Sequence, residues 1–454
     1  MQEFDLVVIG AGPGGYETAL AAAADMHVAL VEKDELGGTC LNRGCIPTKS
    51  LLYAAELLEG IRHSGVFGIE TGEAAVDFAA VHARKDQVVS QLRSGIAQRM
   101  KQKKVTVLQG IGTILDAHTV RVRGDGGEES LLQAKRILIA TGSRPAIPPI
   151  PGIRCRNVGT SDDLLSKADG IYPRLLIIGG GVIGVEFASV FAAMGSTVTI
   201  VEALPRIVAN MDREISQSLK MLLKKRGVQV LCDTGVEEIR EDDGALRCIC
   251  RSGEEHLELA ADGILVCTGR KPFTEGLFGE GFTVDEDRGR ILVDEHFRTS
   301  CPDVYAIGDV TGGMMLAHAA TAQGRCALAH MLGRTPPVNL TIPACIYTDP
   351  EIASVGMTLE EARERGLQAD SRKYPMSANG KSLLSQQERG FVKVVFEKEN
   401  HRILGAHLMC ARASDLISEM TQAIVRGSTL EEMAAVVRPH PTFSEGITEA
   451  VMEK

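Results

Sequence analysis

The 454-residue sequence has no tryptophan and only six tyrosines. Proteins that bind single-stranded nucleic acid stack bases on aromatic side chains, so this shortage argues against that function. Basic residues number 49 against 59 acidic ones, and the one short basic cluster is Lys101, Lys103 and Lys104 after a predicted helix. A solvated helix end explains this cluster. We therefore expect no nucleic-acid partner.

Long apolar runs are also missing, since none approaches the ~20 residues that cross a bilayer. The sequence leads directly into a predicted strand, so we expect no signal peptide. The cysteines are odd in number, 11, and scattered without the spacing of a disulfide framework. A reducing compartment fits this usage best. We expect a cytoplasmic protein without membrane contact.

Two segments of the sequence resemble each other, and each predicts a βαβ unit. Each has a buried apolar strand, a glycine-rich turn, a helix and a second strand that ends in glutamate. The first copy covers residues 5–32 and the second residues 175–202, and a strand ending in Thr-Gly closes each unit, at Thr141-Gly142 and at Thr268-Gly269. The repeat predicts two dinucleotide-binding domains of the Rossmann type.

The remaining sequence divides around these units. Residues 105–122 and 228–259 alternate apolar and polar residues between turns, which predicts antiparallel meanders. A helical insertion covers about 36–104, and the proline-rich stretch 146–152 forms a rigid crossing between domains. A third domain, which alternates strands and helices, begins near Pro337. The predicted fold class is α/β with a C-terminal α+β domain.

Each glycine-rich turn has the spacing G-x-G-x-x-G. The first glycine forms a tight turn, the second admits a pyrophosphate close to the backbone, and the third lets the helix pack on the strand. The pyrophosphate then meets free N–H groups at the helix N-terminus. The glycines concerned are Gly10, Gly12, Gly15, Gly179, Gly181 and Gly184. One such turn is weak support for a nucleotide site, but two in the same context are strong support.

A glutamate ends the second strand of each unit, Glu32 in the first and Glu202 in the second. A carboxylate at this position accepts hydrogen bonds from ribose hydroxyls. It also repels the 2′-phosphate of NADP, so Glu202 favours NAD. Arg206 lies nearby in the sequence and is the one residue that argues for NADP.

A cysteine pair lies in the insertion, within Gly-Gly-Thr-Cys-Leu-Asn-Arg-Gly-Cys-Ile-Pro-Thr-Lys. Pro47 suits the first turn of a helix, so Cys45 is expected at the helix N-terminus, where the partial positive charge stabilises a thiolate. Lys49 lies one turn further on and adds positive charge. A thiolate of lowered pKa is a good leaving group, so Cys40 and Cys45 are candidates for a redox pair.

Two other interpretations of the pair stay open at this point. Cys40 and Cys45 could be buried structural residues, or they could form half of a metal site with Cys248 and Cys250 as the second half. Metal-binding pairs usually have the spacing C-x₂₋₄-C. Cys248 and Cys250 also lie on one face of a predicted strand, where they fit ordinary apolar positions better. We expect no metal site.

From Asp5 to about Glu449 the chain resembles the pyridine-nucleotide disulfide reductases. The resemblance rests on the two glycine turns, the Cys-x₄-Cys-x-Pro-x-Lys segment, the Thr-Gly endings, Tyr-Ala-Ile-Gly-Asp309, and His440-Pro-Thr-Phe-Ser-Glu445. The segments Cys-Ile-Pro-Thr-Lys-Ser-Leu-Leu, Tyr347-Thr-Asp-Pro-Glu-Ile-Ala-Ser-Val-Gly and Ile-Leu-Gly-Ala-His407 match most closely the branch that oxidises protein-bound dihydrolipoamide.

The resemblance implies where the cofactors bind. FAD would occupy the first unit and NAD the second. Asp309 would bind the ribityl chain of the flavin, and the backbone from Ala317 to Ala319 would meet its ring system. Apart from the resemblance, Gly308-Asp309 also fits a simple turn. The other residues assigned to FAD are Gly10, Gly12, Gly15, Glu32, Lys49, Thr141 and Gly142, and those assigned to NAD are Gly179, Gly181, Gly184, Glu202 and Gly269.

The resemblance also implies a division of the catalytic work. Cys40 would exchange with the substrate thiol, Cys45 would face the flavin, and Lys49 would pair with Glu186 of the second unit. Lys49 and Glu186 also fit plain surface charges. His440 and Glu445 would come from the partner of a homodimer. There the imidazole, with a pKa near ~6.5, would take the proton of the substrate thiol, and the carboxylate would orient the ring.

The implied domains are an FAD domain in two parts, 1–150 and 272–336, an NAD domain, 151–271, and a dimerisation domain, 337–454. The partner would be a lipoyl-carrying protein. A cis peptide is expected at His440-Pro441. Arg438 and Pro439, directly before His440, differ from the residues usual at these positions in the resembling branch of the family. The difference lies at the expected entrance for the substrate.

Several rival functions are weaker. A sister disulfide reductase that acts on another substrate is the nearest rival. Glutathione reductases would carry basic residues near position 202, and mercuric reductases a C-terminal cysteine pair, whereas the last cysteine here is Cys410. A binding module or a flavin oxidase would need neither the cysteine pair nor His440.

Overall fold

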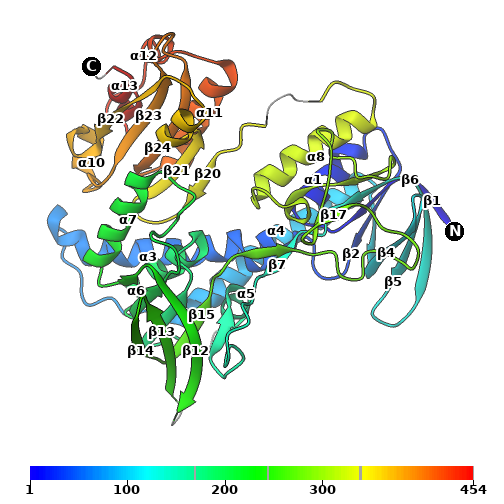
Figure 1. Cartoon of the computed structure of the whole chain (residues 1–454), viewed down its shortest axis with the longest axis horizontal. Helices are drawn as coiled ribbons and strands as arrows, with labels where there is room; N and C mark the ends of the chain where they lie inside the picture. Colours follow the sequence, from blue (N-terminus) through cyan, green and yellow to red (C-terminus); the bar gives the residue numbers. More distant parts are fainter. Residues whose placement is uncertain (168–169, 243–244, 337–339, 453–454) are drawn as a thin grey trace.

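The computed structural model describes residues 1–167, 170–242, 245–336 and 340–452. It has three parts, and the first is completed by β19 and α8, which come after the second part in the chain (Figure 1). The first nucleotide-binding part lies at one end of the molecule, the second lies beside it, and the C-terminal part packs on the second. Pro337, where the third domain was expected to begin, lies outside the described residues.

The first part is built on a seven-stranded sheet. Parallel strands form one half, and β6 continues into an antiparallel half. The strands are, in spatial order, β3 (Thr106–Gln109), β2 (Val28–Glu32), β1 (Gln2–Ile9), β6 (Glu129–Ile139), β5 (Thr119–Arg123) and β4 (Ile111–Asp116), with β19 (Val304–Ala306) pairing with β6. All five residues of β2 are buried, as expected for a strand covered on both faces.

Helices cover one face of this sheet, and the antiparallel strands β4 and β5 with the segment before β19 cover the other. α1 (Pro13–Ala22) and α8 (Ala317–Met331) pack against each other, and α4 (Phe78–Gln102) lies on the same apolar cluster as α1. Leu30 is fully buried in that cluster, so its removal to alanine would cost about 2–5 kcal/mol of stability. The carboxyl ends of the parallel strands consequently form a rigid edge.

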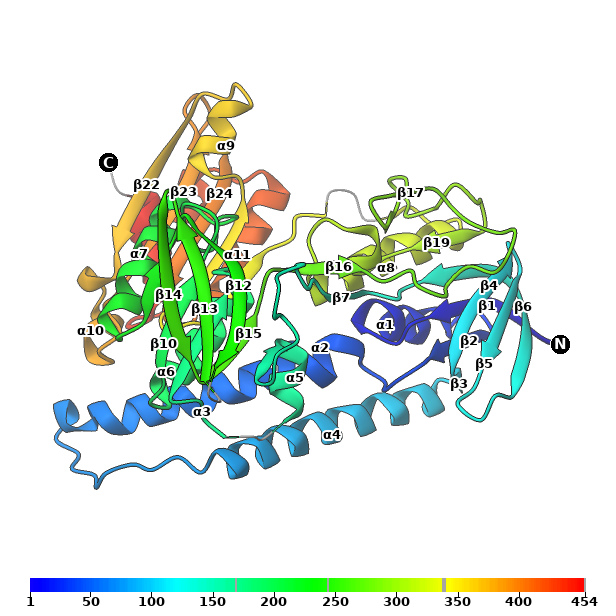
Figure 2. The ribbon, with the colours of Figure 1, turned by 60° about the horizontal axis from the view of Figure 1, so that its bottom comes forward.

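The predicted helical insertion is present as two long helices joined by an irregular segment. α2 (Gly38–Arg43) and α3 (Cys45–His63) precede the short 3₁₀ turn η1 (Ser64–Phe67), and α4 follows. Asp77 caps α4 by accepting a hydrogen bond from the Ala80 N–H. Figure 2 shows α3 and α4 side by side, running beneath both nucleotide-binding parts.

The second part repeats the plan with a five-stranded parallel sheet. In spatial order its strands are β11 (Gln229–Leu231), β10 (Thr197–Val201), β9 (Arg174–Ile178), β15 (Gly263–Val266) and β8 (Val158–Thr160). α6 (Val182–Ala193) follows the glycine turn, and α7 (Arg213–Lys225) leads to β11, while α5 (Ser161–Ser166) follows β8. A separate antiparallel meander covers this sheet and consists of β12 (Thr234–Asp242), β13 (Ala245–Ser252) and β14 (Glu255–Ala261).

Both predicted meanders were placed too early in the chain. β3 and β11 do not belong to them, because each pairs in parallel with the strand before its helix. The reason is the long preceding helix, α4 or α7, which brings the chain back across the sheet in the same direction. A two-stranded ribbon, β7 (Ser143–Pro145) with β16 (Arg270–Pro272), joins the two parts.

The C-terminal part is a five-stranded antiparallel sheet with helices on its faces. Its strands are β20 (Ala344–Ile346), β21 (Glu351–Gly356), β24 (Ile403–Cys410), β23 (Phe391–Glu397) and β22 (Ala369–Pro375). Its helices are α9 (Leu359–Glu364), α10 (Gly380–Leu384), α11 (Ala413–Arg426), α12 (Leu430–Ala434) and α13 (Glu445–Met452). The predicted α+β class is confirmed.

Candidate functional site

The first glycine turn lies between β1 and α1 and has the geometry that its spacing predicts. Gly10 has φ +102°, a conformation that favours glycine. A Cβ on Gly15 would lie 1.9 Å from the Gly10 carbonyl oxygen, so no side chain fits where the helix meets the strand. Gly12 has open space around its Cα, and it lines the large cavity between the parts of the molecule. Its backbone is therefore accessible to a ligand.

The second turn, between β9 and α6, repeats this geometry closely. Gly179 has φ +107°, and a Cβ on Gly184 would lie 2.0 Å from the Gly179 carbonyl oxygen. Gly181 again faces open space. In each turn, two glycines are required by the fold and the middle one leaves room for a ligand.

The two strand-ending glutamates hold these turns. Glu32 accepts hydrogen bonds from the N–H groups of Ala11, at 2.6 Å, and Asp34, at 2.9 Å. Glu202 accepts from Gly180 at 2.6 Å and Leu204 at 2.8 Å. Burial raises the pKa of the Glu32 carboxyl. Both carboxylates thus fix the turn backbone, a role that their position in the sequence, which suggested a contact with ribose, does not reveal.

Arg206, the residue that argued for NADP, is turned away from the cavity. Its guanidinium donates to the carbonyl oxygens of Ala209, at 2.7 Å, and Met211, at 3.0 Å. It does not belong to the residues that line the cavity, whereas Glu202 does. The charge beside the second turn is therefore negative, which favours NAD.

A continuous cavity of about 2420 Å³ runs between the parts. Ordinary ligand pockets measure roughly 300–1,000 Å³, so this one has room for two dinucleotides. Both glycine turns, the cysteine pair and the start of the C-terminal part contribute to its walls. The predicted residues at this cavity are Gly10, Gly12, Gly15, Glu32, Cys40, Cys45, Lys49, Thr141, Gly142, Gly179, Gly181, Glu186, Glu202, Gly269, Asp309 and Ala317.

The cysteine pair spans the junction of two helices. Cys40 lies in α2, and Cys45 is the first residue of α3, as its sequence context predicted. Both are free thiols in this structure. Interaction with the Cys40 thiol, together with the Lys49 ammonium, lowers the pKa of Cys45 to about 7. Interaction with Cys45 and burial raise the pKa of Cys40. Cys45 is therefore the member of the pair that ionises first as the pH rises.

Asn42, which the sequence patterns did not single out, holds α2 in place. Its side-chain amide donates to the carbonyl oxygens of Leu36, at 3.1 Å, and Gly38, at 2.9 Å. Its carbonyl oxygen accepts from Arg93 of α4 at 2.8 Å. No sequence pattern marks this contact, because Asn42 and Arg93 are 51 residues apart.

The predicted pair of Lys49 and Glu186 is present. Nζ of Lys49, in α3, lies 2.9 and 3.0 Å from the two carboxylate oxygens of Glu186, in α6. Glu186 also accepts a hydrogen bond from the backbone N–H of Tyr347 at 3.0 Å. The Glu186 side chain is only 3% exposed, and these partners satisfy its buried oxygen atoms. The interpretation of both residues as plain surface charges is therefore wrong.

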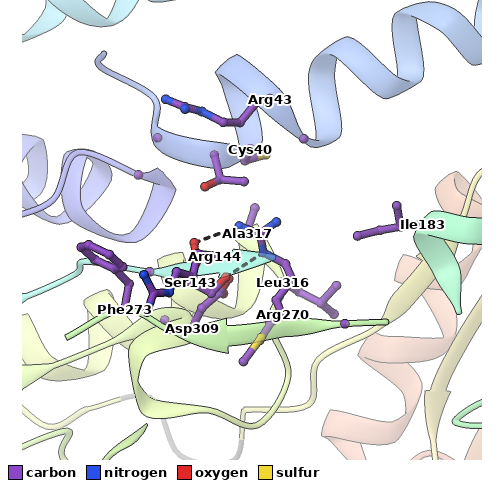
Figure 3. A pocket seen from close by; sticks show the side chains of 18 of the residues that line it. Cys40, Arg43, Ser143, Arg144, Ile183, Arg270, Phe273, Asp309, Leu316 and Ala317 are labelled. Carbon is purple, nitrogen blue, oxygen red and sulfur yellow. Dashed lines mark hydrogen bonds between the residues drawn. The ribbon is translucent and has the colours of Figure 1, made fainter. Parts of the chain in front are cut away.

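Asp309 is the second residue of a 3₁₀ turn, η2 (Gly308–Thr311), after β19 and faces the cavity beside the β7–β16 ribbon (Figure 3). Its carboxylate accepts from the Ser143 hydroxyl at 2.5 Å, and Arg270 donates to the same hydroxyl at 2.8 Å. Ala317 is the first residue of α8, so its free N–H group points out of a helix N-terminus. Ser143 and Arg270 complete this side of the cavity, and no sequence pattern had indicated them.

The Thr-Gly endings lie where the ribbon leaves the two sheets. Gly142 and Gly269 both have positive φ, 72° and 107°, and nothing lies near the Cβ position of either. The Thr141 hydroxyl donates to the Phe273 carbonyl oxygen at 2.7 Å. These turns place the β7–β16 ribbon along one wall of the cavity.

His440 and Glu445 form a pair at the end of the C-terminal part. Nδ1 of His440 lies 2.9 Å from the Glu445 carboxylate, which also accepts from the Thr442 N–H at 2.8 Å. These hydrogen bonds lower the pKa of Glu445, the Thr442 bond most. The His440 side chain is 79% exposed and does not line the cavity, so within one chain it is not brought to Cys40. The expected cis peptide at His440-Pro441 is confirmed.

Arg438 does not present its charge at the surface. Its side chain is 4% exposed, and its guanidinium donates to Glu419 at 2.5 Å and to the Thr448 hydroxyl at 2.7 Å. Arg438 thus stabilises the loop that carries His440. Its guanidinium is not presented at the surface beside His440.

Cys248 and Cys250 are core residues of β13. Both are fully buried, and their sulfur atoms lie 3.6 Å apart. Among the described residues, no group of three or more histidine, cysteine, aspartate or glutamate side chains could hold a metal ion. In the same part of the chain, no helix is both long and apolar enough to cross a membrane.

Comparisons with known proteins identify the family of this chain. Residues 4–324 match the family model of the pyridine nucleotide-disulphide oxidoreductases, and residues 342–451 match the dimerisation domain of that family. The chain belongs to this family. The match to the dimerisation domain supports a homodimer.

Relatives within the family cover almost the whole chain. A dihydrolipoyl dehydrogenase of Bacillus subtilis is 38% identical over 99% of this chain and 98% of its own length. One of Chlamydia pneumoniae is 39% identical over 98% and 95%. Among solved structures, an HOCl-induced flavoprotein disulfide reductase from Escherichia coli is similar with a TM-score of 0.87 and 31% identity, over 99% of this chain and all of its own.

As an enzyme of this disulphide oxidoreductase family, the protein uses FAD and NAD. The residues of the cavity fit both groups. Two glycine turns leave open backbone at Gly12 and Gly181, each before a helix N-terminus suited to a pyrophosphate. The Asp309 carboxylate lines the same cavity and suits the hydroxyl groups of the ribityl chain of FAD. The volume also suffices for two such cofactors.

Proposed function

We propose that this protein oxidises protein-bound dihydrolipoamide to lipoamide, with NAD⁺ as the electron acceptor. The observation that carries the proposal is the Cys40–Cys45 pair, with a Cys45 pKa of about 7, in a cavity sized for two dinucleotides. The disulfide form of a cysteine pair whose leaving sulfur is a stabilised thiolate exchanges readily with a substrate dithiol. Identity of 37–40% to several dihydrolipoyl dehydrogenases over nearly the full length supports this substrate.

The proposed reaction begins with the Cys40–Cys45 disulfide. His440 of the partner subunit takes the proton of a substrate thiol, and the partner's Glu445 stabilises the imidazolium. The substrate thiolate attacks the Cys40 sulfur, so a mixed disulfide forms and Cys45 leaves as the thiolate. The second substrate thiol then attacks the substrate sulfur of the mixed disulfide, closes the lipoyl ring and releases Cys40. Two electrons have moved from the substrate to the cysteine pair.

Each remaining residue has a part in this scheme. FAD, when bound, supplies the two-electron chemistry that links the dithiol to NAD⁺. Lys49 keeps positive charge beside the Cys45 thiolate, and Glu186 holds Lys49. We assign Gly10, Gly12, Gly15, Glu32, Thr141, Gly142, Asp309 and Ala317 to the FAD site, and Gly179, Gly181, Gly184, Glu202 and Gly269 to the NAD site.

The lipoyl arm would be carried by a protein partner, from a 2-oxo acid dehydrogenase complex or the glycine cleavage system. We place the reaction in the cytoplasm, where a reducing environment keeps the scattered cysteines as thiols. Within the homodimer, the cavity of one subunit would open beside His440 of the partner subunit.

Steady-state oxidation of dihydrolipoamide by the purified flavoprotein tests the proposal. NADH formation is followed with NAD⁺ and then NADP⁺ as acceptor, and Cys40→Ser is the control. We expect turnover with NAD⁺, at least ~10-fold less with NADP⁺ because of Glu202, and none in the control. Failure to oxidise dihydrolipoamide, with NADH-dependent reduction of another disulfide, would contradict the proposed substrate. It would favour the sister branch that includes the similar HOCl-induced reductase.

A further inference from the structure

Three parts of the chain meet at one aromatic ring, that of Tyr347. Tyr347 directly follows β20, the first strand of the C-terminal part. Lys49 comes from α3 of the first part and Glu186 from α6 of the second, and all three residues line the same cavity. The Lys49–Glu186 pair therefore has a third neighbour.

Tyr347 contacts the pair in two separate ways. Its backbone N–H donates to Oε1 of Glu186 at 3.0 Å. Its ring lies under Nζ of Lys49, with 4.5 Å from the nitrogen to the ring centroid, which is within the range of a cation–π contact. The ammonium of Lys49 is thus held by a carboxylate on one side and by an aromatic face on another.

The position of this ammonium matters because Cys45 lies one turn before Lys49 in α3. Residues four apart in a helix share a face, so the ammonium projects beside the Cys45 sulfur. Glu186 is also close enough to act on Cys45, with the opposite effect. A lysine side chain has a flexible four-carbon stem, and it is 31% exposed here, so contacts must fix its ammonium between thiol and carboxylate.

We propose that Tyr347 is a positioning residue, whose ring holds the Lys49 ammonium beside the Cys45 sulfur. A cation–π contact uses the face of the ring and not the hydroxyl, which stays neutral because partial burial raises the Tyr347 pKa to about 12. The N–H bond to Glu186 is made by the backbone, so it survives any side chain at position 347. The ring can therefore be tested separately. The inference rests on the proposed thiolate role of Cys45, but not on the identity of the dithiol.

The test measures the rate at which iodoacetamide alkylates Cys45 in the reduced holoenzyme, as a function of pH. Peptide mass spectrometry separates Cys45 from Cys40. The variants are Tyr347→Leu, which removes the ring, and Tyr347→Phe, which keeps it. Tyr374→Leu is the matched control, since Tyr374 is a half-buried tyrosine of β22 that does not line the cavity.

We expect Tyr347→Leu to lower the alkylation rate at pH 7 about three- to tenfold, and to move the rate profile to higher pH, because the Lys49 charge is no longer held in place. Tyr347→Phe and Tyr374→Leu are expected to stay within about twofold of the wild type. The Lys49 amine should also acylate faster in Tyr347→Leu, since one of its contacts is gone.

Fluorinated phenylalanines at position 347 provide a second test that preserves shape. Successive fluorines weaken the negative face of the ring without changing its packing, so the alkylation rate should fall stepwise with fluorine number. A wild-type profile in Tyr347→Leu, an equal loss in Tyr347→Phe, or no trend with fluorine would each overturn the inference. A wild-type Cys45 that is unreactive at neutral pH would instead overturn the proposed redox role, and the inference with it.

Discussion

The two nucleotide-binding units share their turns but differ beyond the second strand of each unit. Gly10 and Gly179 have φ values within 5° of each other, at 102° and 107°, and Glu32 and Glu202 bind the turn backbone at the same 2.6 Å. After β2, however, the chain forms α2, α3 and α4 and adds the cysteine pair. After β10 it passes to the amphipathic α7 without such an insertion.

The difference shows that nucleotide binding and thiol chemistry are separable parts of this fold. The repeated turns provide two sites for dinucleotides, and they are similar because the same backbone geometry serves both. The insertion supplies the reactive sulfur atoms and Lys49. Lys49 then joins the insertion to Glu186 of the second unit, so the thiolate lies between the two sites.

The largest expected effect breaks the chemistry and spares the nucleotide sites. In Cys45→Ser, turnover of dihydrolipoamide should fall to the background of the assay, because no leaving thiolate remains. FAD content and NAD affinity should stay within about twofold of the wild type, because neither glycine turn changes. Cys155→Ser, outside the insertion, is the control for turnover. A residual rate near that of the control would contradict the separation of the two parts.

Alanine at the glycines tests whether the two turns are equivalent. Gly15→Ala and Gly184→Ala place Cβ 1.9 and 2.0 Å from a backbone oxygen, so each should lower the free energy of unfolding by about 1–3 kcal/mol or more. Gly12→Ala and Gly181→Ala face open space and should fold normally. The first should lose FAD affinity and the second NAD affinity alone. Thermal unfolding and flavin fluorescence measure the outcomes, and loss of the same cofactor in both variants would contradict the assignment.

The link between the insertion and the second unit can be weakened in Lys49→Met. Cys45 has a pKa of about 7, lowered below the ordinary thiol value, so its alkylation should rise as the pH increases through about 7. Without the Lys49 ammonium the pKa moves upward, and the rate at pH 7 should fall about tenfold. The control is Lys85→Met. In the wild type, the Lys85 ammonium donates to the Leu165 carbonyl oxygen and not to Glu186. An unchanged pH profile would show that Lys49 does not act on Cys45.

An effect confined to one cofactor is expected for the glutamate that closes the second turn. Glu202→Ala removes two hydrogen bonds to the turn backbone and should raise KM for NAD⁺ about tenfold, without changing KM for the dithiol. Arg206→Ala should leave the preference for NAD⁺ over NADP⁺ within about twofold, because its guanidinium bonds the Ala209 and Met211 carbonyls. A gain of NADP⁺ activity in Glu202→Ala, but not in Arg206→Ala, would support Glu202 as the residue that selects NAD⁺ over NADP⁺.

Local patterns predicted much of this molecule. The turns, the placement of Cys45 at a helix start, and the pairing of Lys49 with Glu186 all followed from spacing or from resemblance. The roles of β3 and β11 did not, because a short apolar strand does not reveal which neighbour it pairs with. The sequence distances to Tyr347, Ser143 and Arg270 likewise hide contacts that depend on how three parts of the chain meet.

Mixed dimers test the central claim most directly, namely that thiols from one subunit work with the base of the other. Cys40→Ser and His440→Gln chains, each inactive alone, are dissociated, mixed in equal amounts and reassembled. A mixed dimer holds one intact site, so random assembly should restore about a quarter of the wild-type rate of dihydrolipoamide oxidation. No recovery, despite mixed dimers shown by native mass spectrometry, would contradict a site shared between subunits.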